Sequence, residues 1–189
     1  MLFRSMNGKE MIRHSIDTLA KVLDNVIVVT NSTSFQKVQD LGKQHRNVFT
    51  FKNDKDCRIE SIRVGLAHAI NSRNVIIHDA ARPYITGGNI QTLLNFSENF
   101  LLTQFYFRLV NGLIKVSSDG SQVVPREQHM ELVTPQIIDY RLAVDLYKNH
   151  IDAENCEIIP ILDKLKITYN LVEGHPRFLR KITTPDDIY

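Results

Sequence analysis

The sequence predicts a single layered α/β domain with a mostly parallel sheet. Through the first half of the chain, stretches with helical spacing alternate with short apolar strands. The runs "NVIVVT" (25–30) and "NVII" (74–77) are rich in Val and Ile without alternation, as in strands buried on both faces of a parallel sheet. The chain has 189 residues, of which 43% are hydrophobic, so it can build one full-sized core.

The elements of the first half follow from these patterns. The first helix places Met11, Ile16 and Leu19 on one face, and the third places Ile62, Leu66 and Ile70 on one face. The elements predicted are a helix at 8–23, a strand at 25–30, a polar helix to about residue 44, a strand at 47–51, a helix at 57–70 and a strand at 74–77.

The second half changes character. Residues 105–127 hold two extended segments around "SSDG", which predicts a hairpin that forms a protruding arm. The later elements predicted are helices at 136–149 and near 152–166, and strands at 167–174 and 180–184. Thr184 as N-cap and Pro185 at the first helical position indicate that a last helix starts there. The sequence has no repeats or low-complexity linkers, so we interpret residues 1–189 as one domain.

Composition narrows the class of protein. A net charge of +2 gives no reason to expect a nucleic-acid or membrane partner. Cys57 and Cys156 lack the spacing of zinc ligands. The count of two cysteines does not exclude a disulfide between them. The sequence has no apolar run long enough for a transmembrane helix and no signal-peptide pattern at its start. We therefore expect a soluble cytosolic protein.

The candidate site follows the strand at 74–77, where the sequence reads "HDAARP" (78–83). Ligands of open α/β sheets bind beyond the carboxyl ends of the strands, and Asp79 is placed at such an end. A carboxylate there suits Mg²⁺ that is shared with a polyphosphate. Arg82 would brace the loop or pair with an anion, while Ala80 keeps the backbone open to a ligand. The alternative is an ordinary strand end whose acid caps a turn.

"HDAARP" after an apolar strand resembles the signature of the cytidylyltransferases that act on sugar-alcohol phosphates. This group includes the bacterial methylerythritol-phosphate enzyme and the ribitol-phosphate enzymes of bacteria and animals. Three further strings resemble the family in the same order: "RIESIRVGL" (58–66), "VTPQ" (133–136) after Arg126, and "LVEGHP…RKITTPDD" (171–187). The resemblance covers the chain from about Phe3 onward and implies a three-layer, Rossmann-like fold of the nucleotidyltransferase type.

The resemblance implies a nucleotide site for CTP. Asp79 would hold Mg²⁺ on the triphosphate, and Ser61 would touch the cytosine ring. Asp56 and Arg58 would lie in the loop before Ser61, with Ala80 beside the nucleotide. The alternative for Ser61 is an ordinary hydroxyl inside a helix.

The resemblance also implies a site for the second substrate, a polyol phosphate. Arg126 on the arm would reach its phosphate in a partner subunit, so we expect a homodimer formed through the arm. Lys181 would neutralise phosphate charge near the reacting centre, and Thr134 would line the substrate pocket. The alternative for Arg126 and Lys181 is that both are ordinary solvated charges.

The sequence departs from the family at its front. The family begins with an apolar strand and a glycine-rich loop that cradles the triphosphate, whereas "MLFRSMNGKEMI" resembles the segment just after that loop. We therefore expect the first strand and the loop to be missing. Either the sequence is a fragment or has a mispredicted start, or the protein is a relic with impaired catalysis. In the arm, the family's Arg-Asp-Thr reads Asn111-Gly112-Leu113.

The function predicted first is transfer of CMP from CTP to D-ribitol 5-phosphate, which gives CDP-ribitol and pyrophosphate for the synthesis of O-mannosyl glycans on proteins. "LVEG" followed by Pro and a basic-apolar run favours this animal branch of the family. One alternative is the 2-C-methyl-D-erythritol 4-phosphate cytidylyltransferase of isoprenoid synthesis. A second alternative is a catalytically impaired paralogue that dimerises.

Overall fold

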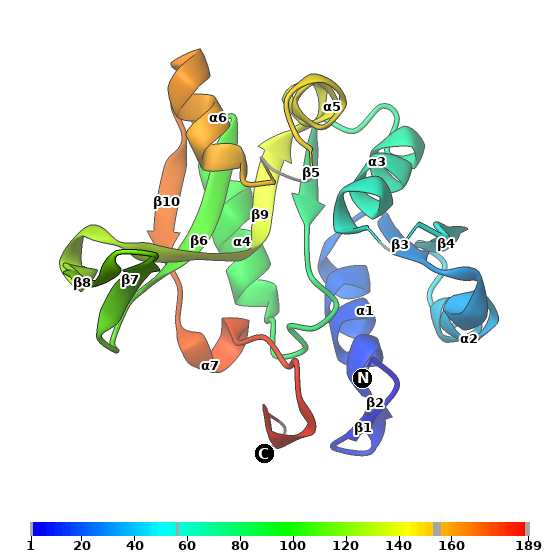
Figure 1. Ribbon diagram of the computed structural model, residues 1–189. Helices are drawn as coiled ribbons and strands as arrows, with labels where there is room; N and C mark the ends of the chain where they lie inside the picture. Colours follow the sequence, from blue (N-terminus) through cyan, green and yellow to red (C-terminus); the bar gives the residue numbers. More distant parts are fainter. Residues whose placement is uncertain (1, 56, 153–155, 188–189) are drawn as a thin grey trace.

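The computed structural model describes residues 2–55, 57–152 and 156–187, and it has the α/β architecture that the sequence predicts (Figure 1). The helices are α1 (Met11–Val22), α2 (Ser32–Gly42), α3 (Arg58–His68), α4 (Gly87–Phe96), α5 (Tyr140–Asn149), α6 (Ile158–Leu165) and α7 (Pro176–Leu179), with 3₁₀ turns η1 (Arg126–Gln128) and η2 (Pro185–Asp187). The strands are β1 (Ser5–Met6), β2 (Lys9–Glu10), β3 (Val26–Thr30), β4 (Val48–Lys52), β5 (Asn74–Ile77), β6 (Leu102–Arg108), β7 (Leu113–Ser117), β8 (Gly120–Val124), β9 (Met130–Asp139) and β10 (Asn170–Glu173).

The largest sheet has four strands in the order β10-β6-β9-β5. β10 runs parallel to β6, whereas β9 is antiparallel to both of its neighbours, so the sheet is mixed and not mostly parallel. The cause is the excursion between β6 and β9: the chain leaves the sheet at the end of β6, forms the β7–β8 hairpin, and returns in the opposite direction.

Helices cover both faces of this sheet (Figure 1). On one face Leu146 of α5 and Leu162 of α6 share a core cluster with Ile138 of β9. On the other face Leu93 of α4 and Leu179 of α7 pack in a cluster with Ile137. Successive side chains of a strand point to opposite faces, so neighbouring residues of β9 serve the two halves of the core. The sheet and its helices thus form three layers.

β3 and β4 form a separate parallel pair. In the described part of the chain, no ladder joins this pair to β5, so β3 and β5 each keep one edge without a strand partner. Side-chain packing connects the two sheets instead: Val26 of β3 and Ile76 of β5 belong to the same core cluster around Ile90. The predicted absence of the family's first strand stays a prediction.

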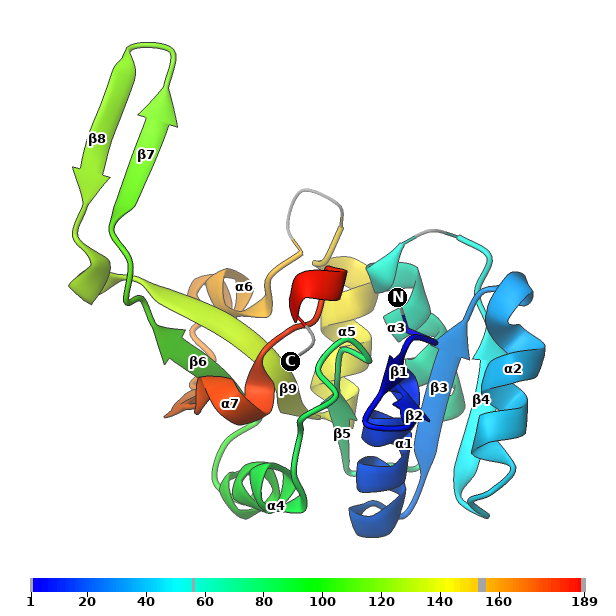
Figure 2. The same ribbon diagram turned by 90° about the horizontal axis from the view of Figure 1, so that it is seen from below.

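The β7–β8 hairpin extends away from the body of the molecule (Figure 2). All residues of β7 are exposed, as are the first four of β8. The predicted range of 105–127 is too wide at its start, because residues 105–108 belong to β6 and lie in the sheet. The hairpin itself occupies Leu113–Val124.

Three predicted elements need correction. The helix predicted at 136–149 begins only at Tyr140, because residues 136–139 continue β9 between β5 and β6. The string 133–136 therefore lies inside a strand. Residues 180–184 form no strand, and their segment is held by single hydrogen bonds instead of a ladder. The first helix starts at Met11, after the β1–β2 turn.

Helix α4 was not expected from the sequence. Thr86 caps it by accepting a hydrogen bond from the amide of Asn89, whose side chain in turn accepts from the amide of Thr86. The two glycines that open the helix weaken the helical pattern, which explains why it was missed.

Candidate active site

The structure gathers three basic side chains around Asp79, the residue two positions beyond β5. Arg58 Nε lies 3.1 Å from Asp79 Oδ1, and Lys181 Nζ lies 3.7 Å from Oδ2. Arg82 Nε lies 3.8 Å from Oδ2. Arg58 opens α3 and Lys181 belongs to the C-terminal segment, so the fold joins residues far apart in the sequence.

These bases keep Asp79 ionised. Burial alone would raise the pKa of its carboxyl, but the charge and hydrogen bond of Arg58, with the charges of Lys181 and Arg82, hold the pKa below its ordinary value. Three positive charges face one negative charge, so the cluster suits an anionic ligand.

The backbone around Asp79 is fixed by bonds from three directions. The amide of Asp79 donates to Thr134 Oγ1 of β9 over 3.2 Å, and the amide of Arg82 donates to the carbonyl of Asp79 over 2.9 Å. The amide of Ile182 donates to the carbonyl of Ala81 over 2.7 Å, which docks the C-terminal segment on this turn. Thr134 is buried, and its hydroxyl is in contact with the Asp79 turn; its role in lining a substrate pocket stays a prediction.

Arg82 braces the loop, which was one of the two roles considered for it. The side chain is only 7% exposed, and its Nη1 donates to the carbonyl of Leu179 at the end of α7. Ala80 packs against the cluster of Ile12 and Ile16 on α1. Both residues thus fix the turn that carries Asp79.

Ser61 lies one helical turn after Arg58, on the same end of α3. Its hydroxyl accepts a hydrogen bond from Asn53 Nδ2 over 2.9 Å and donates to the carbonyl of Cys57 over 3.3 Å. Asn53 also accepts from the amide of Lys55 over 3.1 Å, so it organises the loop before α3. The predicted contact of Ser61 with a cytosine ring stays a prediction. Asp56 lies outside the described residues.

Arg126 is not part of the cluster around Asp79. It lies in η1 at the base of the hairpin, where Nη1 donates to the carbonyl of Val110 over 2.7 Å and Nε pairs with Glu127. The predicted contact of Arg126 with a substrate phosphate in a partner subunit stays a prediction.

Sequence reasoning missed two side chains that interact at this turn, His78 and Ser15. His78 Nε2 lies 3.2 Å from Ser15 Oγ of α1, and burial lowers the pKa of His78 to about 4, so the ring is neutral near pH 7. The only signal was a histidine directly before Asp79, and the sequence gives no hint that Ser15 would be its partner. Asp187, discussed below, was likewise missed.

Asp79 could bind Mg²⁺ only if a bound substrate supplied further ligands to the ion. In residues 2–55, 57–152 and 156–187, no three His, Cys, Asp or Glu side chains gather as a metal site. Mg²⁺ is commonly held by one or two carboxylates together with substrate phosphates, and one carboxylate is what this turn offers.

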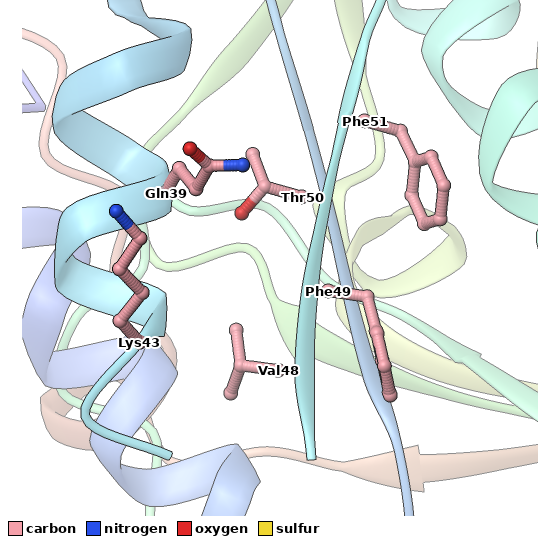
Figure 3. A pocket seen from close by; sticks show the side chains of 6 residues that line it. All are labelled: Gln39, Lys43, Val48, Phe49, Thr50 and Phe51. Atoms are coloured by element: carbon pink, nitrogen blue, oxygen red, sulfur yellow. The ribbon is translucent and has the colours of Figure 1, made fainter. Parts of the chain in front are cut away.

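A shallow hollow of about 350 Å³ lies elsewhere, between α2 and β4 (Figure 3). Its lining residues are Gln39, Lys43, Val48, Phe49, Thr50 and Phe51. It contains none of the predicted site residues, so we do not identify it with the site.

The fold and this site define an α/β protein in which basic side chains surround an acid just beyond the end of β5, an arrangement that suits an anionic ligand. The whole chain, residues 1–189, matches the sequence model of the family 2-C-methyl-D-erythritol 4-phosphate cytidylyltransferase (IspD). The chain belongs to this family, and it is a nucleotidyltransferase of the cytidylyltransferase class. The predicted family and the α/β nucleotidyltransferase fold are thereby confirmed, with a mixed sheet in place of the mostly parallel one.

Individual relatives agree with this assignment. A 2-C-methyl-D-erythritol 4-phosphate cytidylyltransferase of Clostridium botulinum (strain Eklund 17B / Type B) is 29% identical over 98% of this chain and 86% of its own length. A bifunctional ribulose 5-phosphate reductase/CDP-ribitol pyrophosphorylase of Haemophilus influenzae is 22% identical over 99% of this chain and 42% of its own length.

Solved structures show the same fold. The 4-diphosphocytidyl-2C-methyl-D-erythritol synthase of Anaerococcus prevotii DSM 20548 has a TM-score of 0.86 at 19% identity, over 97% of this chain and 85% of that one. The 2-C-methyl-D-erythritol 4-phosphate cytidylyltransferase of Thermus thermophilus has a TM-score of 0.81 at 20% identity, over 99% and 89%. Each helix in the described ranges is too short or too polar to cross a membrane.

Proposed function

We propose that this cytidylyltransferase transfers CMP from CTP to 2-C-methyl-D-erythritol 4-phosphate and releases pyrophosphate. The family match over residues 1–189 and the names of the curated relatives favour this substrate over the D-ribitol 5-phosphate that was predicted first. The structural observation that carries the proposal is the convergence of Arg58, Arg82 and Lys181 on Asp79.

D-Ribitol 5-phosphate is the second candidate. The relative from Haemophilus influenzae, whose name includes a CDP-ribitol pyrophosphorylase, matches 99% of this chain. Its 22% identity equals that of one of the methylerythritol-phosphate relatives, so identity alone does not separate the two polyols.

The reaction asks for alignment and charge neutralisation, not for a protein nucleophile. An oxygen of the polyol phosphate forms a bond to the α-phosphorus of CTP, and the bond from this phosphorus to the pyrophosphate oxygen breaks. Two polyanions that repel each other must be held in line while charge grows on the leaving group. Basic side chains around a metal-binding acid match this demand.

Each site residue takes one role in this proposal. Asp79 holds Mg²⁺, which when bound neutralises charge on the triphosphate. Arg58 and Lys181 have side chains that are 47% and 46% exposed, so both can turn from Asp79 to a phosphate oxygen. Arg82 is buried and bonded to the carbonyl of Leu179, so it supplies a fixed charge and holds the turn.

The proposal includes a homodimer in which Arg126 of one copy serves the polyol phosphate of the other. Within one copy Arg126 sits at the base of the β7–β8 hairpin, away from the cluster around Asp79, which is the arrangement that a shared site requires.

The direct test follows pyrophosphate release from CTP and Mg²⁺ with each polyol phosphate in turn. We expect release with 2-C-methyl-D-erythritol 4-phosphate and a much lower kcat/KM with D-ribitol 5-phosphate. The reverse order would move the assignment to the second candidate. Release with neither, from a folded protein, would favour the catalytically impaired paralogue.

Asp79→Asn tests the metal role. The amide keeps the size of the side chain and an acceptor for the neighbouring bases, but it is a poor Mg²⁺ ligand. We expect turnover to fall at least about 100-fold with little change in melting temperature. Asp40→Asn, on the exposed face of α2, is the control and should keep wild-type turnover. Normal turnover of the Asp79→Asn protein would rule out the metal-binding role of Asp79.

A further inference from the structure

The segment that carries Lys181 has no place in a sheet. Residues 180–184 form neither strand nor helix, and the segment is docked on the body through Ile182, whose side chain is 1% exposed and whose amide bonds to Ala81. Lysine has a flexible four-carbon stem, so the place of its ammonium depends on how firmly the backbone is held. The question is what fixes the chain on either side of Lys181.

One carboxylate closes the segment. Oδ2 of Asp187 accepts from the amide and the hydroxyl of Thr183, over 2.8 and 3.1 Å, and from the amide and the hydroxyl of Thr184, over 2.8 and 3.1 Å. The pattern resembles a capping box, in which an acid reaches back to the amides before a helical turn.

Asp187 also contacts the other side of Lys181. Its backbone carbonyl accepts a hydrogen bond from Arg180 Nη2. The residue before Lys181 and the residue after Ile182 are therefore both tied to Asp187, while Ile182 is anchored in the core. These bonds close a short ring of chain from which the Lys181 side chain projects towards Asp79.

The carboxylate is suited to this task at any physiological pH. The hydrogen bonds from the amides of Thr184 and Thr183 lower the pKa of Asp187 to about 2. The acceptor is therefore ionised, and hydrogen bonds to an ionised acceptor are stronger than those to a neutral one.

We propose that Asp187 is a positioning residue that holds Lys181 within reach of Asp79 and of the phosphates handled there. As far as the phosphates are concerned, this inference rests on the proposed function. A displacement of about 1 Å in a charged group beside a reacting centre costs on the order of 100-fold in rate, so fixing the backbone of Lys181 matters to the reaction.

The kinetic test uses Asp187→Ala, Asp187→Asn and the control Asp186→Ala, which removes the exposed acid next in the chain. We expect Asp187→Ala to lower kcat for pyrophosphate release about tenfold, with KM for CTP nearly unchanged. Asp187→Asn keeps an acceptor oxygen, so its kcat should fall less. Asp186→Ala should keep the wild-type kcat. In a Lys181→Ala background Asp187→Ala should have no further effect. An equal loss with and without Lys181 would overturn the proposal.

A second measurement does not depend on turnover. In protein with ¹³C-labelled lysine, Asp79→Asn should shift the ε-carbon signal of Lys181, since it removes the neighbouring charge. When Asp79→Asn is introduced into the Asp187→Ala protein, the Lys181 signal should shift much less than it does in the wild type. If Asp187→Ala does not fold, the Asp187→Asn protein serves in its place. A full shift there would overturn the positioning role. If the wild type releases no pyrophosphate with either polyol phosphate, the proposed function fails and this signal alone decides about Asp187.

Discussion

At the scale of single residues, Asp17 of α1 shows how a surface acid can join distant segments. Its carboxylate pairs with Lys9 Nζ over 3.0 Å and with His45 Nε2 over 2.9 Å, and Arg13 Nε lies 3.7 Å away. Burial by itself would raise the pKa of Asp17, but the hydrogen bonds from Lys9 and His45, with the charges of Lys9 and Arg13, leave it lowered. The acid thus ties α1 to β2 and to the loop before β4.

This lowered pKa predicts a pH-dependent stability. A carboxyl whose pKa is lower in the folded state stabilises the protein above the pKa of the unfolded chain, and this contribution is lost as the pH falls through the folded value. We expect Asp17→Asn to reduce the free energy of unfolding by about 1 kcal/mol at pH 7, as for partly exposed ion pairs. The deficit should shrink as the pH falls below about 4.

Urea denaturation at several pH values measures this deficit. Asp24→Asn, which changes an exposed acid two residues after α1, should match the wild type throughout. A deficit of the same size at neutral and at strongly acidic pH would show that Asp17 does not act through its charge.

The site shows at the same scale what a sequence can and cannot predict. Asp79 was singled out by its place after a buried strand, Arg58 and Lys181 because their strings resemble a family, and the structure brings all three together. Asp187 stands three residues after Thr184, which is the spacing of a capping box, but this spacing does not reveal its bond with Arg180 beside Lys181, and Asn53 carries no pattern. Such partners become visible only once tertiary structure places them.

At the scale of secondary structure, α4 depends on its cap. Thr86→Ala removes the hydroxyl that accepts from the amide of Asn89, and two glycines follow that contribute little to helix stability. We expect a loss of about 1 kcal/mol in the free energy of unfolding, measured by thermal or urea denaturation. Thr92→Ala, inside the same helix and partly exposed, should be neutral or slightly stabilising, and a Thr86→Ala protein as stable as Thr92→Ala would contradict the cap.

Most elements of the first half were predictable, since their apolar patterns have one period each. The errors arose where patterns were ambiguous. Residues 136–139 include two adjacent Ile residues, and a short apolar run fits a buried strand as well as a helix. Here Ile137 and Ile138 are buried on opposite faces of β9, a choice decided by its partners β5 and β6. The pairing that makes the sheet mixed was equally beyond local patterns.

At the scale of the whole molecule, the β7–β8 hairpin exposes apolar side chains. Ile114, Val116 and Val123 are 59%, 73% and 78% exposed, and a lone two-stranded hairpin is marginally stable in water. In the proposed homodimer these side chains are covered by the second copy. Val116→Lys with Val123→Lys should therefore convert a dimer into a monomer in analytical ultracentrifugation.

The control for this experiment is Ile70→Lys, which places the same charge at a side chain that is 67% exposed just after α3. We expect it to sediment as the wild type does. A wild type that is monomeric at micromolar concentration, or a double variant that stays dimeric, would rule out association through the hairpin.

The separation of β3–β4 from the larger sheet affects how the molecule comes apart. In the described residues the seam between the two sheets has no ladder hydrogen bonds, and α3 spans it, with Ile59 and Leu66 in the cluster of α5 and α6. Arg58 starts this helix, the next element after β4, and Asp79 follows β5, so their ion pair links the segment after β4 to the segment after β5. The amides of β3 and β4 should exchange before those of β6 and β9. A nucleotide bound at Arg58 and Asp79 should slow the exchange of β3 and β4, because binding stabilises the state in which the two sheets are packed together.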